Sequence, residues 1–179
     1  MPTALLIIDV QKALTSGRYE AFEAKRVIDR INHVARLARA AGAPVIIIQH
    51  EDQGGLFDYG SPGWQLADGL EALPTDLYVR KRATDSFHKT ELHDLLQARG
   101  ITQLIACGIQ SEFCVDTTVR RALALGYPVT LVSDGHSTVD NEVLSAAQIS
   151  AHENVTLANI TSFGPRVRPV PASDVRIAD

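Results

Sequence analysis

The sequence predicts an α/β fold, a single-domain three-layer sandwich in which a central parallel sheet of about six strands carries helices on both faces. Short apolar runs alternate along the chain with segments whose apolar residues recur at helical spacing. Apolar runs of this kind are typical of strands buried on both faces, and the alternation is typical of right-handed crossovers between parallel strands. No repeat, low-complexity run or linker interrupts the pattern, so residues 1–179 are interpreted as one domain.

The first expected strand is the apolar run of residues 4–8, which ends at Asp9. Apolar residues at helical spacing then predict a helix that Gly42 ends and that Pro44 prevents from continuing. The same two signals recur to the end of the chain. The expected strands cover residues 4–8, 45–48, 77–79, 104–106, 129–132 and 155–158, and the expected helices cover residues 20–41, 90–99, 113–125 and 141–153.

Two segments fit neither pattern. Residues 50–73 are rich in Gly, Asp and Pro and contain Trp64, the only tryptophan. A loop of this length in a compact domain is usually functional or a lid. The tail that begins at Gly164 contains three prolines, and we expect it to pack irregularly or to reach a partner subunit.

The composition excludes several classes of protein. A net charge of −4 with scattered Lys and Arg residues argues against binding to nucleic acid, and no apolar run approaches the length of a membrane span. The first residues lack the pattern of a signal peptide. Cys107 and Cys114 are expected in a strand and at a helix start, so we expect two free thiols and a cytoplasmic location.

Cys114 is the strongest candidate for a catalytic residue. It is expected at the start of a helix that follows a buried strand, where unpaired N–H groups carry partial positive charge and favour the thiolate. Asp9 and Lys81 follow two other expected strands, and ligands of open parallel sheets bind at these strand ends. Asp9 could then take the thiol proton, and Lys81 could stabilise both negative charges.

Each of these residues also has a structural interpretation. Cys114 could be a small buried hydrophobe, and Asp9 could cap a turn. Lys81 lies between Arg80 and Arg82, and such a basic cluster is usually a solvated surface. A strand shifted by one residue would turn Arg80 or Arg82 inward instead. The sequence lacks the glycine-rich and nucleophile-elbow motifs of dinucleotide-binding proteins, P-loop proteins and serine hydrolases.

Three ordered motifs carry a resemblance to a known family: LLIIDVQ at residues 5–11, KRATDSFHKTEL at 81–92 and CGIQSEFCVDTTVRRALALGY at 107–127. With VTLVSDGHST at 129–138, the sequence resembles the isochorismatase-like cysteine hydrolases over residues 3–163. This family includes nicotinamidases and N-carbamoylsarcosine amidase. The resemblance implies a Rossmann-like topology and an Asp–Lys–Cys catalytic triad. In this sequence the triad corresponds to Asp9, Lys81 and Cys114.

The resemblance also implies a cis peptide bond between Ile109 and Gln110, with the N–H groups of Gln110 and Cys114 forming an oxyanion hole. Gln11 and Phe87 are expected to line the substrate pocket by the same analogy. His50 and Trp64 are further pocket candidates, because both fall in or beside the long loop. His88 and His136 are also expected in loops, where each could touch substrate or lie on the surface.

The chain departs from nicotinamidases at their metal site, which uses an Asp and several His residues after the second strand. Here that stretch reads Gln49-His50-Glu51-Asp52, so we expect no metal and no other cofactor. Family analogy further suggests a homodimer or a larger homo-oligomer that acts on a small molecule and binds neither nucleic acid nor membrane.

The presence of Cys114 favours hydrolysis of a C–N bond in a small amide, ureide or lactam through an acyl-enzyme. One alternative is a vinyl-ether hydrolase of the isochorismatase type, in which Asp9 donates a proton and Cys114 is dispensable. Another is a catalytically idle member of the family that serves as a binding or assembly module.

Overall fold

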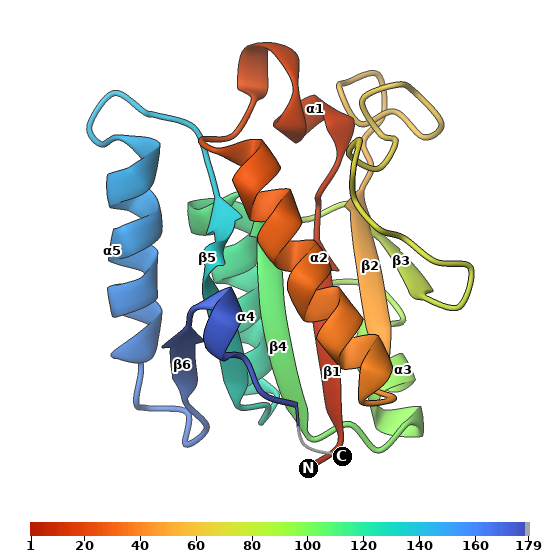
Figure 1. The fold of residues 1–179 in the computed structure, drawn as a ribbon, viewed down its shortest axis with the longest axis vertical. Coiled ribbons are helices and arrows are strands. Elements are labelled where there is room, and N and C mark those ends of the chain that lie inside the picture. The colour runs from red at the N-terminus through yellow and green to blue at the C-terminus, as the bar shows by residue number, and fades with distance from the viewer. Residues whose placement is uncertain (178–179) are drawn as a thin grey trace.

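A six-stranded parallel sheet forms the centre of the protein in the computed structural model, which describes residues 1–177 (Figure 1). The strand order is β3-β2-β1-β4-β5-β6, and all five neighbouring pairs are parallel, which confirms the predicted fold class. The strands are β1 (Thr3–Ile8), β2 (Val45–His50), β3 (Leu77–Lys81), β4 (Gln103–Ile109), β5 (Val129–Ser137) and β6 (Val167–Val170).

Helices and short helical turns connect these strands. The α-helices are α1 (Lys12–Thr15), α2 (Ala24–Ala40), α3 (Leu92–Ala98), α4 (Asp116–Ala124) and α5 (Ala146–Ala158). Two 3₁₀ turns, η1 (Gly17–Tyr19) and η3 (Ala172–Asp174), and one π-helical turn, η2 (Ser111–Val115), complete the elements. None of the helices within residues 1–177 combines the length and the apolar character needed to cross a membrane.

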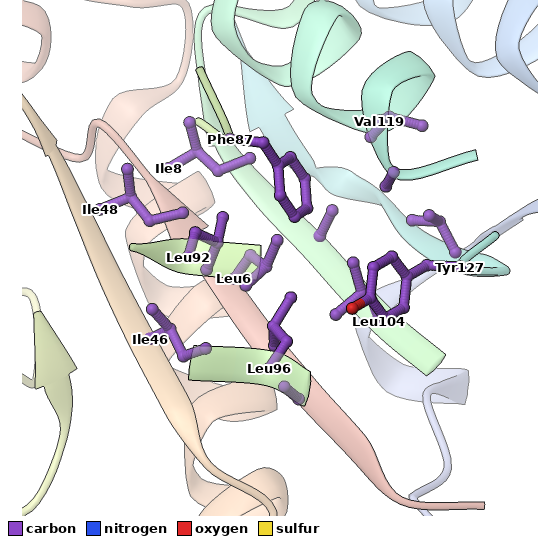
Figure 2. Close-up of a cluster of buried hydrophobic side chains, with 14 of the residues drawn as sticks. Leu6, Ile8, Ile46, Ile48, Phe87, Leu92, Leu96, Leu104, Val119 and Tyr127 are labelled. Carbon is purple, nitrogen blue, oxygen red and sulfur yellow. The ribbon is translucent and has the colours of Figure 1, made fainter. Parts of the chain in front are cut away.

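The sheet separates two hydrophobic cores. Successive side chains of a strand point to opposite faces, so Leu6 and Ile8 of β1 enter one core while Leu5 and Ile7 enter the other. Helix α2 covers the second core, and α3, α4 and α5 contribute to the first (Figures 1 and 2). Because both faces are covered, the inner strands read as continuous apolar runs.

The sixth strand is not where the sequence analysis placed it. Residues 155–158 form the last turn of α5, and the sixth strand is Val167–Val170, inside the tail that was expected to be irregular. A capping box between Ser145 and Gln148 starts α5, and nothing ends the helix before Ala158. Strand β6 tolerates Pro169 because it lies at the sheet edge, where a missing N–H leaves no partner unsatisfied.

Strand β5 is longer than predicted because a bulge interrupts it. Leu131 pairs with Ala106, but the next paired residue, His136, lies opposite Gly108. The intervening Ser133-Asp134-Gly135 follows the predicted end of the strand at residue 132. The chain instead rejoins the sheet, which places His136 in a strand rather than in the predicted loop.

Candidate active site

The candidate site lies at the carboxyl ends of the central strands. β1 and β4 are neighbours, and the chain leaves them toward opposite edges of the sheet, which opens a crevice for a ligand between them. Asp9 directly follows β1, Lys81 is the last residue of β3, and Cys114 lies in η2 after β4. The topology therefore brings together three residues that are remote in sequence.

Lys81 connects the other two residues. Its Nζ lies 2.7 Å from Oδ2 of Asp9 and donates a hydrogen bond of 3.2 Å to Sγ of Cys114. It also donates to the carbonyl oxygen of Ala83 at 2.9 Å, a contact that sequence reasoning could not find because it comes from the backbone. The Asp9 and Lys81 side chains are buried, whereas Cys114 is only partly buried.

The alternation of β3 selects Lys81 over its basic neighbours. Val79 and Lys81 point into the protein, whereas Arg80 and Arg82 are exposed. Both arginines form ion pairs with Glu51 at 3.5 Å and 3.0 Å, respectively. The basic cluster is thus a solvated surface around one inward lysine, and the alternative of a strand shifted by one residue is wrong.

The backbone at the end of β1 has an unusual conformation. Asp9 has φ +50°, in the left-handed region, which costs a residue with a side chain on the order of 1 kcal/mol. The neighbouring strand approaches it closely: a Cβ on Gly108 would lie 2.0 Å from the carbonyl oxygen of Ile8. Only glycine fits there, and its φ of +134° also suits glycine.

The Asp9 carboxylate retains free acceptor capacity. Neither of its oxygens receives a well-aligned hydrogen bond from the residues that the structure describes. Oδ2 is nevertheless engaged by the Lys81 ammonium at 2.7 Å, so the open lone pairs are chiefly those of Oδ1. A buried carboxylate with open lone pairs next to a thiol is suited to accept that thiol's proton.

The turn that carries Cys114 has the backbone that the family resemblance implies. The peptide bond between Ile109 and Gln110 is cis. The carbonyl oxygen of Gln110 then accepts hydrogen bonds from the N–H groups of Phe113 and Val115, both at 3.2 Å. These bonds close the π-helical turn η2, which leads directly into α4.

The resting thiol is protonated, which corrects the expectation of a thiolate at the helix start. Burial and the carboxylate of Asp9 raise the pKa of Cys114 to about 12, against the opposite effect of Lys81. Burial lowers the pKa of the Lys81 ammonium, but the net direction is upward, and the carboxylate of Asp9 is the largest cause of the rise. The site thus holds a neutral thiol beside a carboxylate and a charged lysine.

Among the four predicted pocket residues, His50 is the one with a recorded side-chain contact to a catalytic candidate, Lys81. Its Nδ1 lies 3.4 Å from Nζ of Lys81, and burial together with the lysine charge lowers the pKa of the ring. Phe57 packs edge-on against this ring with centroids 5.2 Å apart. Sequence analysis did not single out Phe57, although an aromatic residue in a loop rich in Gly and Asp is a usable signal.

The side chain of Gln11 stabilises the long loop through hydrogen bonds and does not line an open pocket. Its side chain is fully buried, and its amide donates to the carbonyl oxygens of His50 and Trp64 at 3.0 Å and 2.9 Å. Its Oε1 accepts the N–H of His50 at 2.9 Å. These bonds hold the end of β2 against the loop and use both N–H donors of the amide, and the side chain is buried away from solvent.

Phe87 lies in the core that Cys114 also borders, and Trp64 lines a different cavity. Phe87 is buried in the core on the α3 and α4 face, where its ring stacks on Tyr127 with centroids 6.3 Å apart (Figure 2). Trp64 lines a separate cavity of about 410 Å³ with Tyr59 and Tyr78. None of the three catalytic candidates borders that cavity. The spacing of residues along the sequence could not reveal where the side chains of Phe87 and Trp64 point.

A cavity of about 630 Å³ reaches Lys81 and Ala83 from the β3 side, with Arg82 and His88 among its lining residues. Within residues 1–177, no group of three or more His, Cys, Asp or Glu side chains is arranged so that it could hold a metal ion. The described side chains of the site offer a thiol, a carboxylate, an ammonium and an imidazole.

Comparisons with known proteins identify the family of the chain. The isochorismatase domain family matches residues 3–162. A streptothricin hydrolase of Streptomyces noursei is 39% identical to the chain over 94% of its length, and the chain spans 64% of that relative. A ureidoacrylate amidohydrolase of Caulobacter segnis is 28% identical, with 90% of this chain and 80% of the relative covered. The crystal structure of an isochorismatase from Pseudomonas putida KT2440 is 34% identical, covers 98% of this chain and 90% of its own, and has a TM-score of 0.90.

Proposed function

Because the chain belongs to the isochorismatase family, we propose that it is a cysteine-dependent hydrolase of a C–N bond in a small amide, ureide or lactam. One observation carries this proposal: a buried lysine contacts both a carboxylate at 2.7 Å and a partly exposed thiol at 3.2 Å. This arrangement supplies a nucleophile, a base and a fixed positive charge at one point.

In the first half of the reaction, Sγ of Cys114 attacks the substrate carbonyl carbon as its proton passes to Asp9. The new C–S bond gives a tetrahedral oxyanion, for which the N–H groups of Gln110 and Cys114 are the proposed donors. The protonated Asp9 then gives its proton to the leaving nitrogen, the C–N bond breaks, and an acyl-enzyme remains. Coupling proton transfer to attack is needed because the resting thiol is neutral.

In the second half, Asp9 takes a proton from water, and the resulting hydroxide adds to the acyl carbon. The C–S bond breaks, the sulfur regains the proton, and a carboxylic acid leaves. The Asp9 carboxylate raises the pKa of Lys81 at rest and again in the acyl-enzyme, so Lys81 is charged when each half of the reaction begins. Its role is to balance the negative charge that moves between Asp9 and Cys114.

Two observations support the proposed substrate class: the names of the relatives and the side chains beside Lys81. One relative is named as a hydrolase of streptothricin and another as an amidohydrolase of ureidoacrylate, and these names favour an amide or ureide. His50 is the proposed substrate contact, because its ring borders Lys81 and is held by Phe57. A cytoplasmic location and a homodimer or larger homo-oligomer stay predictions.

The experiment is a mass-spectrometric screen of small amides, ureides and lactams with the wild-type protein and with Cys114→Ala. We expect turnover and a covalent acyl adduct on Cys114 in the wild type, and a loss of turnover of at least about 10³-fold in the variant. Cys107→Ala is the matched control, because it removes the other thiol from a site with no charged neighbour. Amide turnover that survives Cys114→Ala would overturn the acyl-enzyme.

The family name supports a second candidate, hydrolysis of a vinyl ether. Asp9, once protonated, could donate to the alkene carbon, and the thiol would have no part in that step. Isochorismate hydrolysis that persists in Cys114→Ala would establish this alternative. A wild-type protein that turns over neither class, with Cys114 inert toward alkylation, would instead indicate an idle binding module.

A further inference from the structure

A chain of hydrogen bonds with a buried centre runs from α5 through β5 to the turn that carries Cys114. Nε2 of His136 lies 3.1 Å from Oδ1 of Asn154, and Nδ1 of His136 lies 2.8 Å from Oγ of Ser111. Oγ of Ser111 lies in turn 2.9 Å from Oγ of Ser150. Ser111 and His136 are buried in the interior. Helix α5 packs beside β5, so the chain joins two separate elements to η2 (Figure 1).

The direction of each hydrogen bond follows from its fixed end. Nδ2 of Asn154 donates to the carbonyl oxygen of Ser133 at 2.9 Å, so the amide oxygen of Asn154 faces His136. An amide oxygen only accepts, and therefore Nε2 of His136 carries a hydrogen. Burial lowers the pKa of His136, which leaves the ring neutral with a lone pair on Nδ1. Ser111 must then donate its hydroxyl proton to Nδ1, and it can accept from Ser150.

This bond restrains the start of the catalytic turn. Ser111 is the first residue of η2, directly after Gln110 and three positions before Cys114. A second tether lies one residue further on, where Thr138 donates to Oε1 of Glu112 at 2.9 Å. Sγ of Cys114 keeps its 3.2 Å contact with Lys81 only while η2 stays in place. A displacement of about 1 Å at such a site can reduce the rate of reaction by about 10²-fold.

We propose that His136 is a positioning residue for the reaction at Cys114, and that it acts by accepting the hydroxyl hydrogen bond of Ser111 through Nδ1. His136 does not touch the reacting atoms. It sets where the Gln110 and Cys114 N–H groups and the Cys114 sulfur lie relative to Lys81 and Asp9. The turnover part of this inference rests on the proposed function, whereas the geometric part concerns thiol reactivity alone.

Two substitutions of His136 separate its two ring nitrogens. In His136→Asn, the amide oxygen takes the place of Nδ1, which preserves an acceptor for Ser111 and removes the bond to Asn154. In His136→Gln, the amide nitrogen takes the place of Nε2, which preserves the donor to Asn154 and leaves Ser111 without its acceptor. Both variants put a smaller polar side chain in the same buried position, so each is the control for the other.

We expect His136→Gln and Ser111→Ala to lower kcat about 10–100-fold while KM changes less than about threefold. His136→Asn and Ser111→Thr should keep kcat within about threefold of the wild type. Because Ser111 and His136 act through one bond, Ser111→Ala combined with His136→Gln should be no worse than the more impaired single variant. A purely structural role would instead lower the stability of the Asn and Gln variants alike without separating their kcat values, and that result would overturn the proposal.

Alkylation of Cys114 by iodoacetamide gives a readout that does not depend on a substrate. Displacement of η2 weakens the contact with Lys81, so His136→Gln should react about tenfold more slowly than His136→Asn, one unit in the thiol pKa. If the wild type hydrolyses no amide but this difference is found, the proposed function fails and the positioning role stands. Equal alkylation rates in the two variants would remove the positioning role whatever the activity. Should His136→Gln not fold, Ser111→Ala against Ser111→Thr makes the same comparison.

Discussion

Cys107 and Cys114 carry the same side chain close together in sequence, yet their surroundings differ in exposure and in the charges beside them. Burial raises the pKa of both thiols, so neither is a thiolate at rest. Cys107 is fully enclosed in the core on the α2 face, with apolar neighbours. Cys114 is partly exposed and contacts Lys81 beside Asp9. Reactivity at this site should therefore come from a neighbouring base and from access, rather than from a thiolate that already exists.

The largest expected difference between the two thiols is in their rates of alkylation by iodoacetamide. Cys107 can react only when the core opens, which in a domain of this kind has a free energy of about 5 kcal/mol or more, so Cys114 should react at least about 10³-fold faster. The rate at Cys114 should also rise about tenfold per pH unit from pH 7 to 10, because the raised pKa keeps the thiolate fraction growing over this range.

Mass spectrometry of the two cysteine peptides after timed labelling measures both effects. A rate at Cys114 that is already constant near pH 7 would mean that the thiolate forms at rest, and would contradict the neutral thiol. Comparable rates for the two cysteines would contradict the difference in access.

Removal of Lys81 should lower both the stability of the protein and the reactivity of Cys114. Lys81→Met leaves the buried carboxylate of Asp9 without its partner, and loss of one member of a buried ion pair typically destabilises a protein by about 3–5 kcal/mol. The variant should also alkylate more slowly at Cys114, because the cation that lowers the pKa of the thiol is gone. Denaturant unfolding measures the first effect and peptide labelling the second.

Arg36→Met is the matched control, because Arg36 forms an ion pair with Glu71 on the surface. Its loss should change the free energy of unfolding by about 1 kcal/mol or less. Similar losses in the two variants would show that the Asp9–Lys81 pair is solvated in solution.

The same contrast shows how far the sequence could predict the molecule. The apolar runs of β1, β2 and β4 are buried on both faces, so periodicity alone located them. It failed at β6, where Pro169 lies at a sheet edge, and at the bulge of β5, where a turn sequence remains within a strand. In both places, neighbours distant in sequence override the local signal.

Within the site, the residues at strand ends were predictable and their environment was not. Asp9 and Lys81 follow from the ends of two strands, because all carboxyl ends of a parallel sheet meet at one edge. Phe87 and Gln11 were expected to face the substrate, but the path of the loops turns both into the interior. The state of the thiol depends on how tightly other elements enclose it, and no local pattern encodes that enclosure.

Asp9→Asn should separate reactivity from catalysis at Cys114. The carboxylate raises the pKa of the thiol, so its neutral replacement lowers that pKa and leaves Lys81 to stabilise the thiolate. Alkylation of Cys114 at pH 7 should then become about tenfold faster, one pKa unit, while hydrolysis is lost with its base. A variant that is slower in both reactions would show that Asp9 acts mainly by holding Lys81 in place.

The smallest expected effect belongs to Cys107. Cys107→Ala removes one buried atom from a close-packed core, which should lower the free energy of unfolding by about 1 kcal/mol and leave kcat within about twofold. Its neighbour Gly108 lies against Ile8, directly before Asp9, so a shift of β4 would reach the base within two residues. Measurement of stability and kcat on the same preparation distinguishes a simple loss of packing from a shift of β4 that reaches Asp9. A fall in kcat without a loss of stability would mean that Cys107 supports the close approach of β1 and β4. The two cysteines would then differ in chemical reactivity, but both would contribute to catalysis.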